Sequence, residues 1–302
     1  MKSNRTAMKK IIPVLALSLC VAFTSCNDEY DADTAQSNYQ PAPGKRVESL
    51  KTTYTANGND YSFEHLFSYD AQGRIKEVNS NIVHYVATPE FYDTVYVKCY
   101  ITSRANYFYD GDKLDVEYSV SREYPDASLK YTSENGTDYG VFNSAGVLTR
   151  FSSLTLDYNT TSLQRGYADG DVFFNVIHNA DGDVSGYIKK RTSTDEIIED
   201  KANRYFYSSI KNKTNFDFSA YFGYWGVEQA VRMISIPYYA TYQLAAFGMM
   251  GATSRHLPLG IIEKGTDGKD NYLYGEWEFD SAGYPLSFVD VNGRRTEITY
   301  CE

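Results

Sequence analysis

The sequence predicts an all-β protein, an antiparallel meander of hairpin repeats curled into a barrel or half-barrel. Three observations support this fold class. Tyrosine and phenylalanine, with 29 and 16 copies in 302 residues, are abundant, and both favour strands. Apolar and polar residues alternate, as between Val116 and Ser121, which gives a strand one apolar face. A unit of aromatic strand, Asp/Asn/Gly turn and second strand recurs along the chain.

The chain starts with an export signal. Basic side chains precede an apolar run of 13 residues, 11–23, which is too short to cross a bilayer core of about 30 Å as a helix. Phe23-Thr24-Ser25-Cys26 then resembles a bacterial lipobox. The resemblance implies that residues 1–25 are a signal peptide cleaved after Ser25, and that Cys26 is lipidated, with palmitate among its acyl chains. The alternative is an ordinary secretory signal in which Cys26 is incidental.

Residues 26–45 read as a flexible acidic tether, because they are polar, contain Pro41 and Pro43, and have no apolar period. Asp28, Glu29 and Asp31 resemble the acidic export tag that lipoproteins of Bacteroidota carry after the lipidated cysteine. That resemblance implies the outer membrane, with the protein lipid-anchored at Cys26 and facing the cell surface. The alternative is a solvated linker.

Charge limits the class of partner. Residues 1–25 hold four basic and no acidic side chains, so the mature chain has 25 Lys+Arg against 39 Asp+Glu, a net charge of −14. Such a surface repels phosphate backbones, which excludes charge-driven binding of nucleic acid. A cationic partner or a neutral glycan remains compatible, and an envelope protein is the other partner we expect. No cofactor is implied.

Residues 46–302 are predicted to form a single all-β domain. The turn glycines Gly73, Gly146, Gly182 and Gly283 lie 73, 36 and 101 residues apart, close to multiples of about 35. Asp or Asn at the start of such a turn bonds its own backbone, and Gly supplies the positive φ. A further copy surrounds Gly111, and a degenerate copy runs from residue 205 to 213.

A helical insert is expected near residues 226–252, within an apolar stretch that interrupts the strand pattern. Ala, Leu, Met and Gln at helical spacing predict two short helices separated by Pro237. Such an insert most simply plugs or caps one end of a curled sheet. Arg232 and Pro237 interrupt it too often for a membrane span.

Two separated motifs resemble a known family. They are Asn215-Phe216-Asp217-Phe218 and the run from Phe247 to Pro258, and the hairpin from Glu278 to Pro285 is similar to the last hairpin of the same family. The family is a Bacteroidota lipoprotein family of a domain of unknown function, described as having a porin-like fold. The resemblance covers most of residues 46–302 and implies a curved sheet or barrel without assigned catalytic residues.

This chain departs from the family at a loose hairpin near Ile210 and over residues 89–109. A barrel embedded in the membrane is also compatible with alternating strands. The Cys-Glu terminus and the lipid anchor argue against it.

The sequence shows no nucleophile elbow, phosphate loop or zinc-protease motif. No metal site is predicted, because the four histidines, His65, His84, His178 and His256, lack ligand spacing. The run from Asn179 to Val184 faintly resembles a calcium loop, but a hairpin turn fits it better. Paired carboxylates for glycoside hydrolysis are the enzymatic alternative, and their dense cluster is Asp195, Glu196, Glu199 and Asp200.

Two further groups are candidate site residues. Tyr221, Tyr224 and Trp225 are the candidate ligand-stacking aromatics, because flat rings stack on sugars; packing in the core is the alternative. Cys99 and Cys301 both lie in strand-like runs, where they either form a disulfide or stay unpaired.

The sequence therefore favours a non-enzymatic, surface-exposed outer-membrane lipoprotein. Its expected role is as a binding or accessory protein at the cell envelope, with a relation to glycans as the finer reading. A glycoside hydrolase-like enzyme and a structural or adhesin subunit are the alternatives.

Overall fold

The computed structural model describes residues 40–41, 43–90, 93–125, 132–152, 154–158, 164–169, 171–201, 204–222, 243–251, 253–264 and 270–302. These residues form strands with two short helical segments, at 218–222 and 243–246, and confirm the all-β prediction. The elements are β1 (Val47–Ala56), β2 (Asn59–Tyr69), β3 (Ile75–Glu90), β4 (Asp93–Asp110), β5 (Lys113–Glu123), β6 (Thr132–Phe142), β7 (Leu148–Phe151), β8 (Leu154–Tyr158), β9 (Gln164–Asp169), β10 (Val172–His178), β11 (Val184–Arg191), β12 (Ile197–Lys201), β13 (Tyr205–Lys211), α1 (Phe218–Phe222), β14 (His256–Lys264), β15 (Asp270–Phe279), β16 (Pro285–Asp290) and β17 (Arg295–Tyr300).

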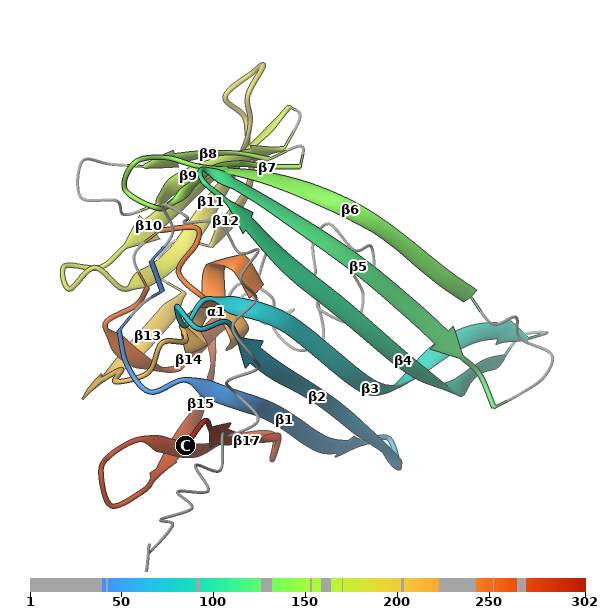
Figure 1. Cartoon of the computed structure of the whole chain (residues 1–302). Coiled ribbons are helices and arrows are strands. Elements are labelled where there is room, and N and C mark those ends of the chain that lie inside the picture. Colours follow the sequence, from blue (N-terminus) through green and yellow to red (C-terminus); the bar gives the residue numbers. More distant parts are fainter. Residues whose placement is uncertain are drawn as a thin grey trace, which may run out of the picture.

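The strands pair in one antiparallel path. It runs from β13 through β14, β15, β16 and β17 to β1, and from there in chain order to β12. The first and last strands of the chain are neighbours, with Val47 opposite Tyr300. Figure 1 shows the resulting curl, in which the long strands β3 to β6 project beyond the others.

The two ends of this path meet at Arg204, which precedes β13. Its backbone N–H donates to the Ser185 carbonyl of β11 at 2.7 Å, and its carbonyl accepts from the Ile262 N–H of β14 at 2.7 Å. Arg204 therefore hydrogen-bonds to β11 on one side and to β14 on the other. Within the described ranges the sheet curls back on itself through this residue, without a ladder between β12 and β13.

Five hairpin turns share one set of hydrogen bonds, which confirms the repeat around the four glycines. In the turn that starts at Asn179, its N–H bonds the Asp183 carbonyl, its carbonyl accepts from Gly182, and its Oδ1 accepts from the Asp181 and Asp183 amides. The glycine of each turn has φ between +75° and +88°, which a side chain resists. The five turns start at Asp70, Asn143, Asn179, Asp280 and Asp290.

Two expected copies differ from this turn. The copy around Gly111 is a tighter hairpin, with Asp110 opposite Lys113. The degenerate copy at residues 205–213 is wrong as a hairpin, because β13 runs to Lys211 while pairing with β14. The described residues of the segment that the repeat left unexplained, 89–90 and 93–109, belong to β3 and β4, the two longest strands among the described residues.

The main core lies inside the curl. Side chains of the segments around α1 and Phe247 pack there against the inner face of the sheet. Figure 1 shows α1 within the curl. Of the predicted helical insert, the structure describes one helical turn at residues 243–246, while residues 226–242 lie outside the described ranges. The largest fully buried side chains of these two segments are Phe216, Phe218, Leu244, Phe247 and Met249.

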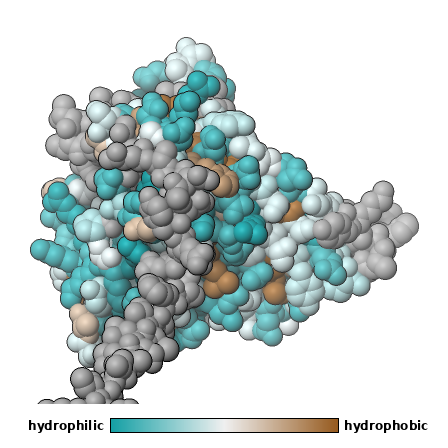
Figure 2. All heavy atoms as spheres, viewed as in Figure 1, coloured by the Kyte–Doolittle hydropathy of each residue, from teal (hydrophilic) through white to brown (hydrophobic). Residues whose placement is uncertain are grey.

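The outer face of the sheet carries charged side chains together with single exposed aromatic and aliphatic ones, such as Phe108 and Tyr139. Along β5 the exposed side chains Lys113, Asp115 and Glu117 alternate with the buried Leu114 and Val116. On neighbouring strands the exposed charges pair with each other, Lys51 with Glu64 at 3.7 Å and Arg104 with Glu77 at 2.6 Å. Hydrophilic residues dominate the face seen in Figure 2. Among the described residues, no helix is long and apolar enough to cross a membrane.

Candidate functional site

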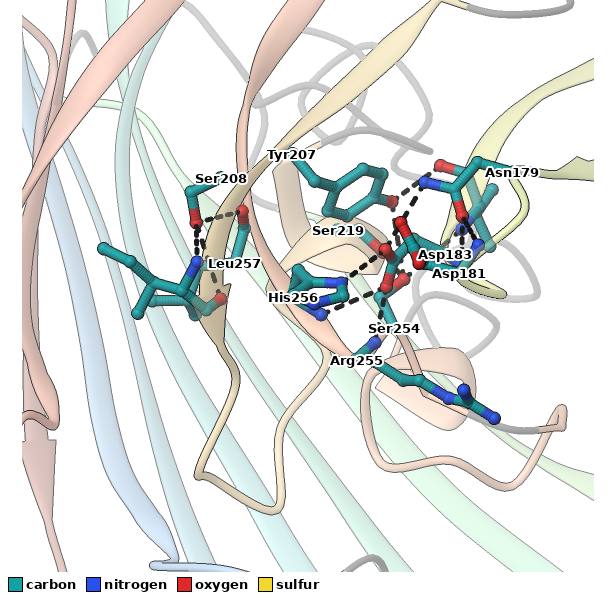
Figure 3. A network of polar contacts seen from close by, with 12 residues as sticks. Asn179, Asp181, Asp183, Tyr207, Ser208, Ser219, Ser254, Arg255, His256 and Leu257 are labelled. Carbon is teal, nitrogen blue, oxygen red and sulfur yellow. Dashed lines mark hydrogen bonds and ion pairs between the residues drawn. The ribbon is translucent and has the colours of Figure 1, made fainter.

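The densest polar network lies where the turn between β10 and β11 meets β13, α1 and the start of β14 (Figure 3). The hydrogen bonds of this network join residues that lie up to 73 positions apart in the sequence. The side chains that make it are Asn179, Asp183, Tyr207, Asp217, Ser219, Ser254 and His256.

Asp183 is the first carboxylate of the network and has no exposed surface. It is the fifth residue of the Asn179 turn, so the turn geometry directs it inward. Its Oδ1 accepts the backbone N–H groups of Arg255 at 2.6 Å and His256 at 3.0 Å. Its Oδ2 lies 2.8 Å from His256 Nδ1. Asp183 therefore holds the start of β14 against the turn.

Asp217 is the second buried carboxylate and caps the start of α1. Its Oδ1 accepts from the backbone N–H and the hydroxyl of Ser219, at 2.8 and 2.6 Å, and its Oδ2 accepts from the Ser254 N–H at 2.6 Å. Burial raises the pKa of Asp217, while these hydrogen bonds act in the opposite direction. The two carboxylates thus bind three successive backbone amides, those of residues 254–256.

Hydroxyl groups complete the network. The Ser219 and Ser254 hydroxyls lie 2.9 Å apart, and the Tyr207 hydroxyl donates to the Val184 carbonyl at 2.6 Å. Burial raises the pKa of Tyr207, so the phenol stays protonated and acts as a donor. The arrangement is a clasp that ties the interior segment to the sheet, and we call these seven side chains the clasp.

Three side chains at the clasp could offer ligands to a metal ion. One ligand atom each of Asp181, Asp183 and His256 lies within 4.8 Å of the others. However, both Asp183 oxygens already accept hydrogen bonds, and a metal ion here would have to displace the contact with His256. The Asn179 side chain is likewise used by turn amides, as the hairpin interpretation of the calcium-like run predicted.

Tyr221, one of the predicted ligand-stacking aromatics, is a core residue. It is 6% exposed, its hydroxyl lies 3.2 Å from Thr52 Oγ1, and its ring meets His65 edge to face at 5.8 Å. A stacking role is therefore wrong for Tyr221, because its ring faces are covered. Tyr224 and Trp225 lie outside the described residues.

The disulfide between Cys99 and Cys301 is not formed, which corrects one of the two expected outcomes. Cys99 is a free thiol with no exposed surface, in a second apolar cluster with Phe63, Ile82 and Ile101. Cys301 instead packs against the main core. The predicted lipidation site Cys26 lies outside the described residues.

The acidic run proposed for hydrolysis lies on the exposed hairpin of β11 and β12. Asp195 pairs with Lys190 at 3.1 Å, and Glu196 pairs with Arg191 at 3.4 Å. Glu199 accepts from the Tyr187 hydroxyl at 3.3 Å. These contacts hold the hairpin together, and the carboxylates point to neighbours within it.

The histidines divide between core and clasp. His65 is buried beside Ser80, and burial lowers its pKa to about 4. Burial also lowers the pKa of His84 and His178. His256 belongs to the clasp, which the sequence did not reveal as a site. The one feature of the sequence that pointed to the clasp was the pair of motifs around Asp217 and Ser254, which the fold brings into contact.

No family model matches the chain, and no curated protein matches it. Among solved structures, the chain is similar to a porin-like protein from Bacteroides uniformis, known from a crystal structure. The two share 11% sequence identity and align with a TM-score of 0.46, over 87% of this chain and 100% of the other.

Proposed function

We propose that this chain is a non-enzymatic lipoprotein, anchored by acyl chains on Cys26 to the outer membrane and exposed at the cell surface. Its role is binding or accessory work at the cell envelope. One observation carries the proposal, the run Phe23-Thr24-Ser25-Cys26 after a basic and apolar segment. Several acyl chains hold a protein firmly where a single chain does not.

The charged side chains on the outer face support a lipid anchor as the means of attachment. Strands that face acyl chains carry an apolar outward band, and Lys or Arg at mid-bilayer costs about 2–4 kcal/mol. Here Lys51 and Glu64 occupy outward positions on β1 and β2, and Arg104 does so on β4. The interior is filled by apolar side chains. Both features suit a domain that stands in water.

The clasp supports a role without catalysis. Asp183 and Asp217 are the buried carboxylates of the clasp, and their oxygens accept hydrogen bonds from backbone N–H groups. A general acid or base needs a proton-transfer partner within reach of substrate. Catalysis at the clasp would require Asp183 or Asp217 to leave these amides.

Glycan binding is the finer part of the proposal, and one surface favours it. Phe108 and Tyr139 are 46% and 62% exposed, and each lies opposite Asp115 of β5 in the strand register. Side chains in one such row share a face, and strands lie about 4.8 Å apart, which separates the two rings by about 10 Å. Two exposed rings beside a carboxylate can stack on sugars and accept from their hydroxyls.

Metabolic labelling tests the anchor. Wild-type cells given labelled palmitate should incorporate it into this protein, and the variant Cys26→Ala should not. Protease added to intact cells should digest the domain if it faces the medium. A labelled protein that resists digestion would place it on the inner side, and an unlabelled wild type would remove the anchor.

A glycan array tests the finer proposal. Binding should fall at least about tenfold for Tyr139→Ala and for Phe108→Ala. The matched control is Tyr274→Ala, which removes a 53% exposed ring on β15. Binding at background for the wild type, or equal loss in all three variants, would refute the assignment of this surface.

A further inference from the structure

The point where the tether enters the domain is fixed by backbone hydrogen bonds. Lys45 N–H donates to the Lys213 carbonyl at 3.2 Å, and the Lys45 carbonyl accepts from Asn215 at 3.1 Å. The Arg46 carbonyl accepts from Cys301 at 3.1 Å. Gly44 has φ +137°, and a Cβ there would lie 2.4 Å from the Lys213 carbonyl oxygen. The tether therefore joins the sheet at one defined corner.

This corner lies at the end of the sheet that carries most of the Asx turns. The Tyr69 hydroxyl, beside the Asp70 turn, donates to the Val47 carbonyl, and the Tyr300 hydroxyl donates to Pro285 beside the Asp280 turn. We call this end of the sheet the turn end. The opposite end, with the β1–β2 hairpin and the tips of β3 to β6, is the far end (right in Figure 1). A strand of 18 residues such as β4 extends about 60 Å.

The corner carries cations held on aromatic rings. Lys45 Nζ lies 5.0 Å from the Tyr284 ring centre and 4.8 Å from that of Tyr300, and Lys213 Nζ lies 5.9 Å from Tyr284. Lys213 is exposed and also donates to the Ala282 carbonyl at 3.1 Å. Lysine and tyrosine together suit the boundary between water and lipid headgroups.

We propose that this corner, formed by Lys45, Lys213, Tyr284 and Tyr300, contacts the phosphate-bearing surface of the membrane, and that the far end points away from it. The inference rests on the proposed lipid anchor. By random-coil scaling, the tether between Cys26 and Lys45 has a root-mean-square reach of about 25 Å, so this end of the domain lies nearer to the bilayer on average than the far end does. The mature chain is acidic overall, and Asp28, Glu29 and Asp31 lie nearer to Cys26 in the sequence. On the domain itself, Lys45 and Lys213 place two positive charges where the tether joins it, and such charges attract anionic headgroups.

The test uses the full-length acylated protein in vesicles of phosphatidylglycerol that contain a phospholipid with a photoreactive headgroup. Cross-linked peptides are mapped by mass spectrometry. We expect cross-links at the corner and not at the β1–β2 hairpin. The double variant Lys45→Gln, Lys213→Gln should lower the yield at the corner at least about fivefold, and phosphatidylcholine vesicles should do the same for the wild type.

Lys98→Gln is the matched control, because Lys98 Nζ also lies 5.0 Å from a tyrosine ring, that of Tyr100, but towards the far end of β4. Its cross-linking should equal that of the wild type. Equal cross-linking at both ends, or no effect of the double variant, would overturn the inference. Intact mass separates the two proposals: a protein without acyl chains refutes the anchor and this orientation together, whereas an acylated protein with equal cross-linking refutes the orientation alone.

Discussion

The clasp should be a main determinant of stability, and Asp183→Ala tests this. The substitution removes the acceptor of the Arg255 and His256 backbone N–H groups, in a residue with no exposed surface. A buried donor left without a partner costs about 1–3 kcal/mol. Two such donors predict that the free energy of unfolding falls by about 3 kcal/mol.

Asp181→Ala is the control within the same turn. Asp181 is exposed, and its contribution to the turn comes from its backbone N–H, which donates to Asn179 Oδ1 and survives the substitution. Its effect should stay within about 0.5 kcal/mol. Urea unfolding followed by circular dichroism measures both variants. A loss below about 1 kcal/mol for Asp183→Ala, or an equal loss for Asp181→Ala, would refute the role assigned to the clasp.

Two further predictions concern buried groups. Because burial lowers the pKa of His65 from 6.5 to about 4, the unfolded chain binds a proton before the folded chain does. The contribution of neutral His65 to the free energy of unfolding is therefore complete above pH 6.5 and is lost as the pH falls towards about 4, a loss of about 3 kcal/mol. The variant His65→Asn should flatten this part of the plot of stability against pH. An unchanged slope would contradict the reasoning. Burial also raises the pKa of the Cys99 thiol, so maleimide should label it at least about a hundredfold more slowly in the folded than in the urea-unfolded protein. Rapid labelling in the folded state would show that its cluster opens.

The hairpins could be predicted because their signals are local. Asp or Asn followed three residues later by Gly specifies the turn. The same signal at Asp290 to Gly293 forms a fifth turn, beyond the four glycines of the predicted repeat. The copy near Ile210 misled because Ser208 and its neighbours resemble a turn, while pairing with β14 keeps them extended. Pairing with a distant strand, rather than the local sequence, therefore determines the conformation of this segment.

The clasp could not be predicted, because it is not local. Asp183 reads as a turn residue, and its partners stand at positions 255 and 256. They come together only because the folded sheet brings the β10–β11 turn beside the start of β14. Tyr221 shows the same limit. It lies in an aromatic-rich stretch of the sequence, and the sequence does not say whether such a ring is exposed to a ligand or, as here, buried in the core.

Fractionation of cells that express Cys26→Ala tests most directly whether acyl chains, rather than strands, hold this protein at the membrane. The wild type should sediment with membranes after a carbonate wash and carry acyl mass, while Cys26→Ala should appear in the soluble fraction with its strands intact by circular dichroism. If Cys26→Ala instead remains in the washed membranes, the polar-faced sheet itself holds the protein there, which contradicts attachment by a lipid anchor.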